Sequence, residues 1–191
     1  MRRMVMAMAV VVMVSWGGMA QDKPSTGFPE PHLAGLKEFK GNLYIAFLKT
    51  GVNWHEAEAY CRWLSAITGQ PFALPTEMQW EKAARGADGR EYPWGEKFDS
   101  ALCNTNESHI YTTTPVGLYP GGLSPFGLFD ASGNVWEWTA DWYQMYPGGD
   151  EKASDDFGEK FKVVRGGSWY NNGRNARCAY RYRNAPVNVD S

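Results

Sequence analysis

The chain has 191 residues, a formal net charge of −2 at pH 7 and 21% charged residues. This near-neutral balance argues against electrostatic binding of nucleic acid, and the length suits one domain with a sizeable core. Aromatic residues make up 15% of the chain and glycines number 21, which together favour a loop-rich fold.

The first 20 residues have the pattern of a signal peptide. Arg2 and Arg3 form a positive start, Met4–Trp16 is apolar, and Gly18–Ala20 offers the small residues of a cleavage site. The apolar stretch is short for a transmembrane helix, although an uncleaved anchor is the alternative. The pattern predicts secretion or a periplasmic location, with no membrane span in the mature chain.

After the signal peptide, residues 21–38 are interpreted as a lead-in segment, and the globular domain is expected over residues 39–191. A helix is predicted over residues 53–68, because Asn53 and Glu56 occupy the two positions of a capping box. A second helix is predicted after Thr76, because Thr76 can cap it and Gln79 completes a second capping box. The apolar face of the first helix would contain Ala57, Tyr60, Cys61, Leu64 and Ile67.

The remainder alternates loops with short apolar stretches. Strands are predicted over residues 113–118, 135–142, 160–165 and 178–183. Two helices followed by long loops and short strands indicate an α+β fold.

Five motifs occur in order along the chain, and together they resemble the formylglycine-generating enzyme, or sulfatase-modifying factor, family. The resemblance implies a C-type-lectin-like fold. The family includes copper-dependent oxidases that convert a sulfatase cysteine into formylglycine, and also non-catalytic binding domains, among them the variable proteins of diversity-generating retroelements. The five motifs are Ala59–Leu64, Leu74–Gly86, Tyr92–Gly95, Gly133–Trp138 and Arg165–Trp169.

The oxidases of this family hold copper(I) with two cysteines in the segment that follows Gly167-Ser168. Here that segment contains a single cysteine, Cys178, and amide side chains cannot replace thiolates as copper(I) ligands. We therefore expect no copper and no catalytic residue, with Cys178 in a structural role. A formylglycine-generating oxidase, or an accessory homologue of one, is the alternative.

Glu77 and Glu81 share a face of the second predicted helix. A pair of this kind can act in acid–base catalysis, but more often it forms a salt-bridged surface.

Four residues suggest a cation site. Asp130 and Glu137 offer carboxylate oxygens, which suit calcium, and the turn between them can direct backbone carbonyls to the same point. The resemblance implies calcium bound by the side chains of Asp130 and Glu137 and by the carbonyls of Gly133 and Val135. In the alternative interpretation, Asp130 and Glu137 only cap turns and accept backbone N–H groups.

The segment from Trp169 onward interleaves tyrosines with asparagines, the residue types that adaptable binding surfaces favour. We expect it to bind a protein or glycan, with Trp138 and Trp142 nearby. Asparagine codons are adenine-rich, so the composition also fits a retroelement-diversified surface. In the opposing interpretation the amides satisfy backbone groups, and the arginines at 177, 181 and 183 pair with core acids. The candidate ligand-binding residues are Trp169, Tyr170, Asn171, Asn172, Arg174, Asn175, Tyr180, Tyr182, Asn184 and Asn188.

The family usually closes with a Gly-Phe-Arg strand, which is not found before Ser191. The resemblance therefore predicts a domain that lacks the last family strand.

Overall fold

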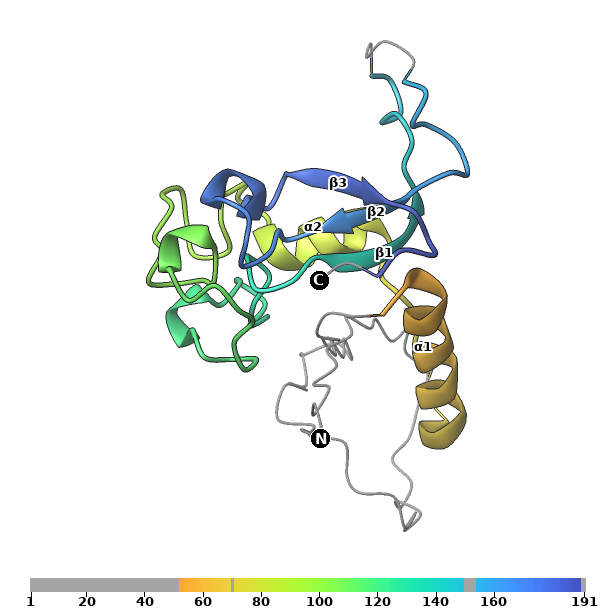
Figure 1. Cartoon of the computed structure of the whole chain (residues 1–191), viewed down its shortest axis with the longest axis horizontal. Helices are drawn as coiled ribbons and strands as arrows, with labels where there is room; N and C mark the ends of the chain where they lie inside the picture. The colour runs from red at the N-terminus through yellow and green to blue at the C-terminus, as the bar shows by residue number, and fades with distance from the viewer. Residues whose placement is uncertain (1–51, 70, 150–153, 190–191) are drawn as a thin grey trace.

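A computed structural model describes residues 52–69, 71–149 and 154–189 of the chain. It contains two α-helices, a three-stranded sheet and long loops, which confirms the predicted α+β class (Figure 1). The predicted signal peptide and lead-in segment lie outside the described residues. Among the residues that are described, no helix is both long and apolar enough to cross a membrane.

Helix α1, Trp54–Thr68, begins with the predicted capping box, in which Asn53 and Glu56 each accept a backbone N–H of the other residue. It ends at Gly69, whose φ of 68° lies in the left-handed region that glycine tolerates. Its buried side chains are Ala57, Cys61 and Leu64, while Ile67 is exposed. The predicted apolar face is therefore confirmed only in part.

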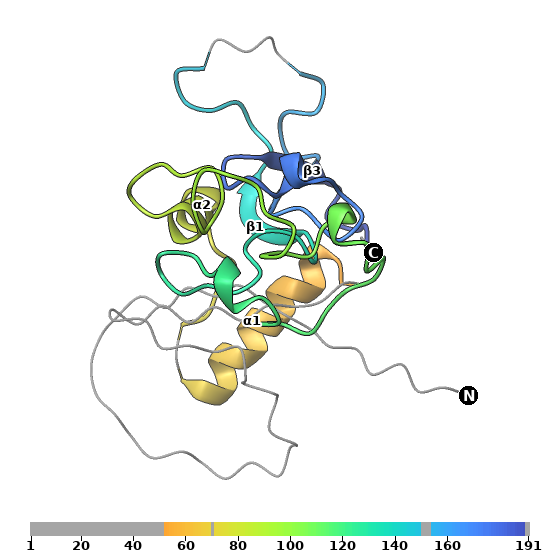
Figure 2. The same cartoon turned by 90° about the vertical axis from the view of Figure 1, so that its left-hand side faces the viewer.

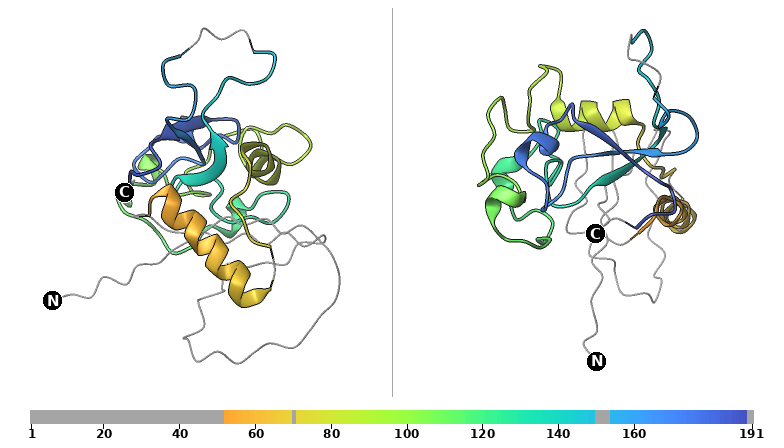
Figure 3. Two further views of the ribbon diagram at one scale, coloured as in Figure 1. Left: turned by 90° about the vertical axis from the view of Figure 1, so that its right-hand side faces the viewer. Right: turned by 45° about the horizontal axis from the view of Figure 1, so that its top comes forward.

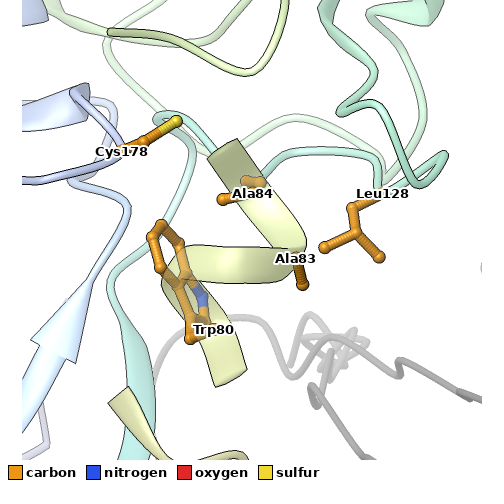
Figure 4. Packing of buried hydrophobic residues seen from close by; sticks show 6 residues of the cluster. Trp80, Ala83, Ala84, Leu128 and Cys178 are labelled. Carbon is orange, nitrogen blue, oxygen red and sulfur yellow. The ribbon is translucent and has the colours of Figure 1, made fainter. Parts of the chain in front are cut away.

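Helix α2, Glu77–Arg85, also begins as predicted, with a capping box between Thr76 and Gln79. It is short, and its buried residues include Trp80, Ala83 and Ala84. These three pack with Leu128, Ala131 and Cys178 into one core cluster (Figure 4).

The sheet has the order β1-β2-β3 and is antiparallel throughout; the strands are β1, Glu137–Trp142, β2, Lys162–Arg165, and β3, Arg181–Asn184. One row across it contains Glu137, Arg165 and Arg181, and the next contains Trp138, Val164 and Tyr182. Because side chains alternate along a strand, the two rows point to opposite faces.

Helix α2 covers the face of the sheet to which Glu137, Arg165 and Arg181 point (Figures 1 and 3). Helix α1 lies beside the sheet and contacts β1 with its first turn, where Nε1 of Trp54 donates to the carbonyl of Thr139 at 2.9 Å. The second face of the sheet, away from α2, is therefore only partly covered by a helix. In Figure 2 the long loops between α2 and β1 gather in front of the sheet.

The predicted strand over residues 113–118 is wrong, since this stretch is irregular. The side chain of Asn134 takes the place of a neighbouring strand: its Oδ1 accepts the N–H of Thr114 at 2.9 Å, and its Nδ2 donates to the carbonyl of Thr114 at 3.2 Å. The backbone of Thr114 is buried and satisfied without a ladder.

The last strand begins at Arg181, not at residue 178 as predicted. The Cys178 N–H donates to the carbonyl of Glu91 at 2.8 Å, and the Cys178 carbonyl accepts from Arg165 at 2.6 Å. Both backbone groups are thus used outside the sheet, and a turn closed by the N–H of Tyr180 on the carbonyl of Arg177 leads into β3.

Candidate functional site

Three aromatic side chains line the face of the sheet that points away from α2. Trp136 stacks on Tyr182 with ring centroids 5.5 Å apart, and Tyr180 lies on the same tryptophan at 6.1 Å. Tyr182 is 44% exposed and the other two rings are half-buried. We call these three residues the aromatic row.

Trp136 is absent from the residues predicted from sequence, which named Trp138 and Trp142 as neighbours of the site. Trp138 lies in the same row of the sheet as Tyr182 and packs against Ala57, Cys61 and Leu74. Its indole N–H donates to the carbonyl of Val52, and the Lys162 ammonium lies over the ring of Trp142. Trp136 precedes β1 directly, and only the register of the sheet places it beside Tyr182.

A second aromatic pair, Trp169 and Tyr170, comes from the loop after β2, with ring centroids 5.4 Å apart in an edge-on arrangement. The Trp169 N–H donates to the carbonyl of Asn134 at 3.0 Å, two residues before Trp136. This backbone bond ties the pair to the segment that supplies the aromatic row. Tyr170 is 42% exposed.

The predicted asparagines divide into exposed and structural groups. Asn172 is exposed, although its Oδ1 accepts the N–H of Arg174 and so caps the short 3-10 helix η4, Gly173–Ala176. Asn184 is buried, and its Oδ1 accepts from the N–H of Ala185 and from the exposed Asn188, each at 2.9 Å. We leave Asn184 out of the candidate surface for this reason.

Asn171 and Asn175 are half-buried and Arg174 is exposed. The Oδ1 of Asn171 accepts from the Ser168 hydroxyl at 2.6 Å, while its carbonyl accepts the N–H of Asn106 at 2.8 Å. The amides therefore hold the loop in place as well as lining it.

A short 3-10 helix, η2, Asn106–Ser108, holds this loop from the opposite side. Both oxygens of Glu107 accept the N–H of Gly173, at 2.9 and 3.1 Å. Burial alone would raise the pKa of Glu107, but the Gly173 N–H and further donors leave that pKa below its ordinary value. A charged carboxylate therefore anchors the start of η4. Nothing in the sequence indicated this contact, since the two residues are 66 positions apart.

The three arginines that the sequence left ambiguous each pair with an acid. Arg177 contacts Glu91 at 3.5 Å, Arg183 contacts Asp156, and Arg181 contacts Glu77 at 2.7 Å. Their charges are thus engaged within the chain.

Glu77 and Glu81 form a salt-bridged face, as the commoner interpretation predicted. Arg165, fully buried, donates to Glu77 at 2.9 Å and to Glu81 at 2.6 Å. Glu77 also accepts hydrogen bonds from the Arg181 guanidinium and from the hydroxyl of Tyr146. Because these donors occupy both of its oxygens, Glu77 has a structural role: its ion pairs join α2 to β2 and β3.

The cysteines lie in three different surroundings. Cys61 packs with Ala57 and Leu74, and the Sγ of Cys103 donates to the carbonyl of Asp99 at 3.8 Å. Cys178 belongs to the core cluster that contains Trp80 of α2 (Figure 4). All three are buried and unpaired, and burial raises the pKa of each thiol to about 12. Residues 169–189 therefore contain one cysteine, and its thiol is buried and protonated. They do not supply the two thiolates that a two-cysteine copper(I) site needs.

The candidate calcium residues are close together and buried. The Oδ2 of Asp130 accepts the N–H of Gly117 at 2.9 Å, and the charge of Asp130 acts on Glu137. Gly133 has a φ of 78°, and a Cβ there would meet the carbonyl oxygen of Asn104 at 2.3 Å, so only glycine fits.

Among the four candidate residues, Glu137 has the surroundings that would best suit a bound cation. Its Oε2 accepts the indole N–H of Trp80, but its Oε1 is buried and lacks a hydrogen-bond partner. Burial raises the pKa of Glu137 well above its ordinary value, the Trp80 bond opposes this, and the charge of Asp130 adds to it. A cation would offset both effects. The described residues contain no cluster of three or more His, Cys, Asp or Glu suited to a metal, so carbonyl oxygens would have to complete the shell.

Comparison with known proteins identifies the family. The model of the sulfatase-modifying factor enzyme 1-like domain matches residues 49–191. The serine/threonine-protein kinase Pkn1 of Chlamydia trachomatis is 37% identical over 147 residues, which cover 74% of this chain and 22% of the kinase. The inactive C-alpha-formylglycine-generating enzyme 2 of Bos taurus is 36% identical over 158 residues, covering 74% of this chain and 46% of that protein.

The formylglycine-generating enzyme of Mus musculus is 32% identical over 154 residues, covering 71% of this chain and 39% of the enzyme. This chain thus spans less than half the length of each of these relatives. An enzyme and a protein named inactive match to similar extents, so membership alone does not decide activity.

Solved structures support the same fold. PvdO of Pseudomonas aeruginosa aligns with a TM-score of 0.62 and 27% identity, covering 79% of this chain and 62% of that one. Treponema denticola variable protein 1 aligns with a TM-score of 0.64 and 20% identity over 88% of this chain and 74% of that one, which indicates a shared fold alone. The chain therefore has the C-type-lectin-like fold and belongs to the sulfatase-modifying factor family.

Proposed function

We propose that this chain is an exported, non-catalytic ligand-binding member of the family. The ligand would contact the aromatic row together with Tyr170, Asn172 and Arg174. The observation that carries this proposal is the contrast between exposed and buried side chains after β2. Tyr170, Asn172 and Arg174 are exposed on a loop held by backbone hydrogen bonds, whereas Cys178, the cysteine of that segment, is buried in the core.

The chemistry of the exposed residues supports a protein or glycan as ligand. Tyrosine and tryptophan supply large, rigid contact area, and asparagine supplies adaptable donors and acceptors. The arginines at 177, 181 and 183 are engaged with acids within the chain, which disfavours a polyanionic ligand.

Export is supported by the N-terminal pattern, with Arg2 and Arg3 ahead of an apolar stretch. A secreted or periplasmic location would expose the candidate surface to ligands outside the cytoplasm. N-terminal sequencing of the protein recovered from outside the cytoplasm tests this, because cleavage after Ala20 leaves Gln21 as the first residue.

Calcium is proposed as a structural cation between Asp130 and Glu137. Support comes from the unpartnered Oε1 of Glu137 and from the close approach that requires glycine at position 133. Bound calcium would neutralise the two carboxylates and hold the turn that leads through Asn134 to Trp136. Its part is to position the aromatic row.

Retroelement diversification of residues 169–188 is a finer form of this proposal. The asparagine content of the segment and the exposed position of Asn172 support it. Sequencing of the flanking DNA would decide it: a near-repeat that differs at adenines and a reverse-transcriptase gene support diversification, and their absence leaves an ordinary binding homologue.

The proposed surface can be tested with defined probes and matched variants. The purified protein is applied to an array of defined glycans and to a displayed library of random peptides. Tyr170→Ala and Tyr182→Ala should each weaken binding of the selected probe by about 2 kcal/mol or more, as for an interface hot spot. Trp63→Ala is the control, because Trp63 on α1 is 44% exposed, as Tyr182 is. Binding that survives both tyrosine changes contradicts the proposed surface.

A further inference from the structure

The step from Asn172 to Gly173 is the sole Asn-Gly sequence in the chain, and it lies within the candidate surface. In such a step the backbone nitrogen of the glycine can attack the Cγ of the asparagine side chain. A C–N bond forms, the side-chain nitrogen leaves as ammonia, and a five-membered succinimide remains. Water then opens the ring to aspartate or isoaspartate, so that no oxidant or reductant is needed. Glycine favours the attack because it has no side chain to obstruct the nitrogen.

Both reacting groups are restrained in the folded chain. The attacking N–H of Gly173 donates to the two oxygens of Glu107 at 2.9 and 3.1 Å. The side-chain oxygen of Asn172 accepts the N–H of Arg174 at 3.1 Å. Asn172 has ψ of 163°, an extended backbone, whereas the ring requires the Gly173 nitrogen to turn toward the Asn172 side chain.

That rotation is also opposed by packing. Gly173 is buried, and a Cβ built on it would lie 2.4 Å from the ring of Phe98. The nitrogen can turn only if its bond to Glu107 breaks and the segment moves away from that ring. Glu107 itself is held in η2, whose Asn106 N–H donates to the carbonyl of Asn171 at 2.8 Å.

We propose that Asn172 is a site of spontaneous deamidation and that Glu107 restrains the reaction in the folded protein by holding the attacking nitrogen. Opening of the contact between η2 and η4 releases it. The product carries a carboxylate where the surface had an amide, next to the charged Glu107. The effect of this new charge on a ligand rests on the proposed function, but the reaction itself does not.

The test is incubation of the folded protein at mildly alkaline pH, followed by trypsin digestion and mass spectrometry. Residues 166–174 form one tryptic peptide that contains Asn171 as well as Asn172, and Asn171 serves as the internal reference. Wild-type protein should deamidate at Asn172 several-fold more slowly than the isolated peptide. Glu107→Ala should raise the rate at Asn172 most of the way to that of the peptide, and it should leave the rate at Asn171 unchanged.

Two further variants separate restraint from loss of fold. Glu107→Gln keeps an acceptor oxygen and should give an intermediate rate, and Glu96→Ala removes an exposed acid and should leave the wild-type rate. Each thermal unfolding midpoint is measured in parallel. Equal rates in wild type, Glu107→Ala and Glu107→Gln, with all three folded, overturn the proposal, as does a wild-type rate equal to that of the peptide. Neither readout involves ligand, so a failed ligand test leaves this result intact.

Discussion

The guanidinium of Arg165 in β2 donates a hydrogen bond of 2.9 Å to Glu77 in the first turn of α2, and both side chains are buried. The same guanidinium reaches Glu81 and the carbonyl of Cys178, and its plane lies near the ring of Trp80. One side chain thus connects the helix, the sheet and the loop that enters β3. Through the carbonyl of Cys178, this network holds the end of the loop that carries Tyr170, Asn172 and Arg174.

Removing the charge of Glu77 should strongly destabilise the fold. Glu77→Gln leaves the cations of Arg165 and Arg181 with Glu81 as the remaining carboxylate of the network, so one buried positive charge is uncompensated. Breaking a buried pair in this way costs about 3–5 kcal/mol of unfolding free energy. Urea unfolding measures the cost. Glu58→Gln is the control, because its pair with Arg62 is exposed and is worth about 0–1 kcal/mol. Similar costs for the two variants would show that the buried network contributes little.

The buried thiols predict a loss of stability at high pH. Burial raises the pKa of Cys178 to about 12, whereas an unfolded thiol titrates near its ordinary value of 9.0. Above that ordinary value the unfolded chain holds fewer protons than the folded one, so the unfolding free energy falls as pH rises. Cys178→Ala should show a shallower decline than wild type when urea unfolding is followed between neutral and strongly alkaline pH.

The same thiols should resist alkylation while the protein is folded. Iodoacetamide reacts with thiolates, which are scarce at neutral pH when the pKa is about 12. Intact-mass analysis should find labelling only after urea is added. Rapid labelling of Cys178 in the folded state would instead indicate an accessible, activated thiolate.

Calcium should stabilise the protein, and chelation should reverse the effect. A ligand present at 100 times its dissociation constant adds about 2.7 kcal/mol to the unfolding free energy. Glu137→Gln removes the carboxylate with the unpartnered oxygen and should abolish the response in thermal unfolding. Glu96→Ala, which removes an exposed acid, should retain it. Identical wild-type midpoints in calcium and in chelator would contradict the proposed site.

Both helix starts could be predicted because their signals are local. Asn53 with Glu56, and Thr76 with Gln79, satisfy backbone groups within one turn of the chain. The strand over residues 113–118 was predicted wrongly because its backbone is satisfied by the side chain of Asn134, which no local pattern reveals.

The candidate site depends on pairings between distant segments. Trp136 joins Tyr182 through the register of the sheet, and Glu107 reaches Gly173 across 66 positions. Residue type alone could not separate the buried Asn184 from the exposed Asn172. Sequence reasoning therefore named a candidate segment, whereas which of its side chains are exposed follows from tertiary structure.

Oxygen uptake with a cysteine-containing sulfatase peptide tests the central claim most directly. The folded protein is supplied with copper(I), and dissolved oxygen and the peptide mass are followed together, with Cys178→Ser as the matched variant. A non-catalytic binding member predicts no peptide-dependent oxygen uptake and no aldehyde product in either protein. Uptake that converts the peptide cysteine to formylglycine in wild type, and is lost in Cys178→Ser, would contradict the account.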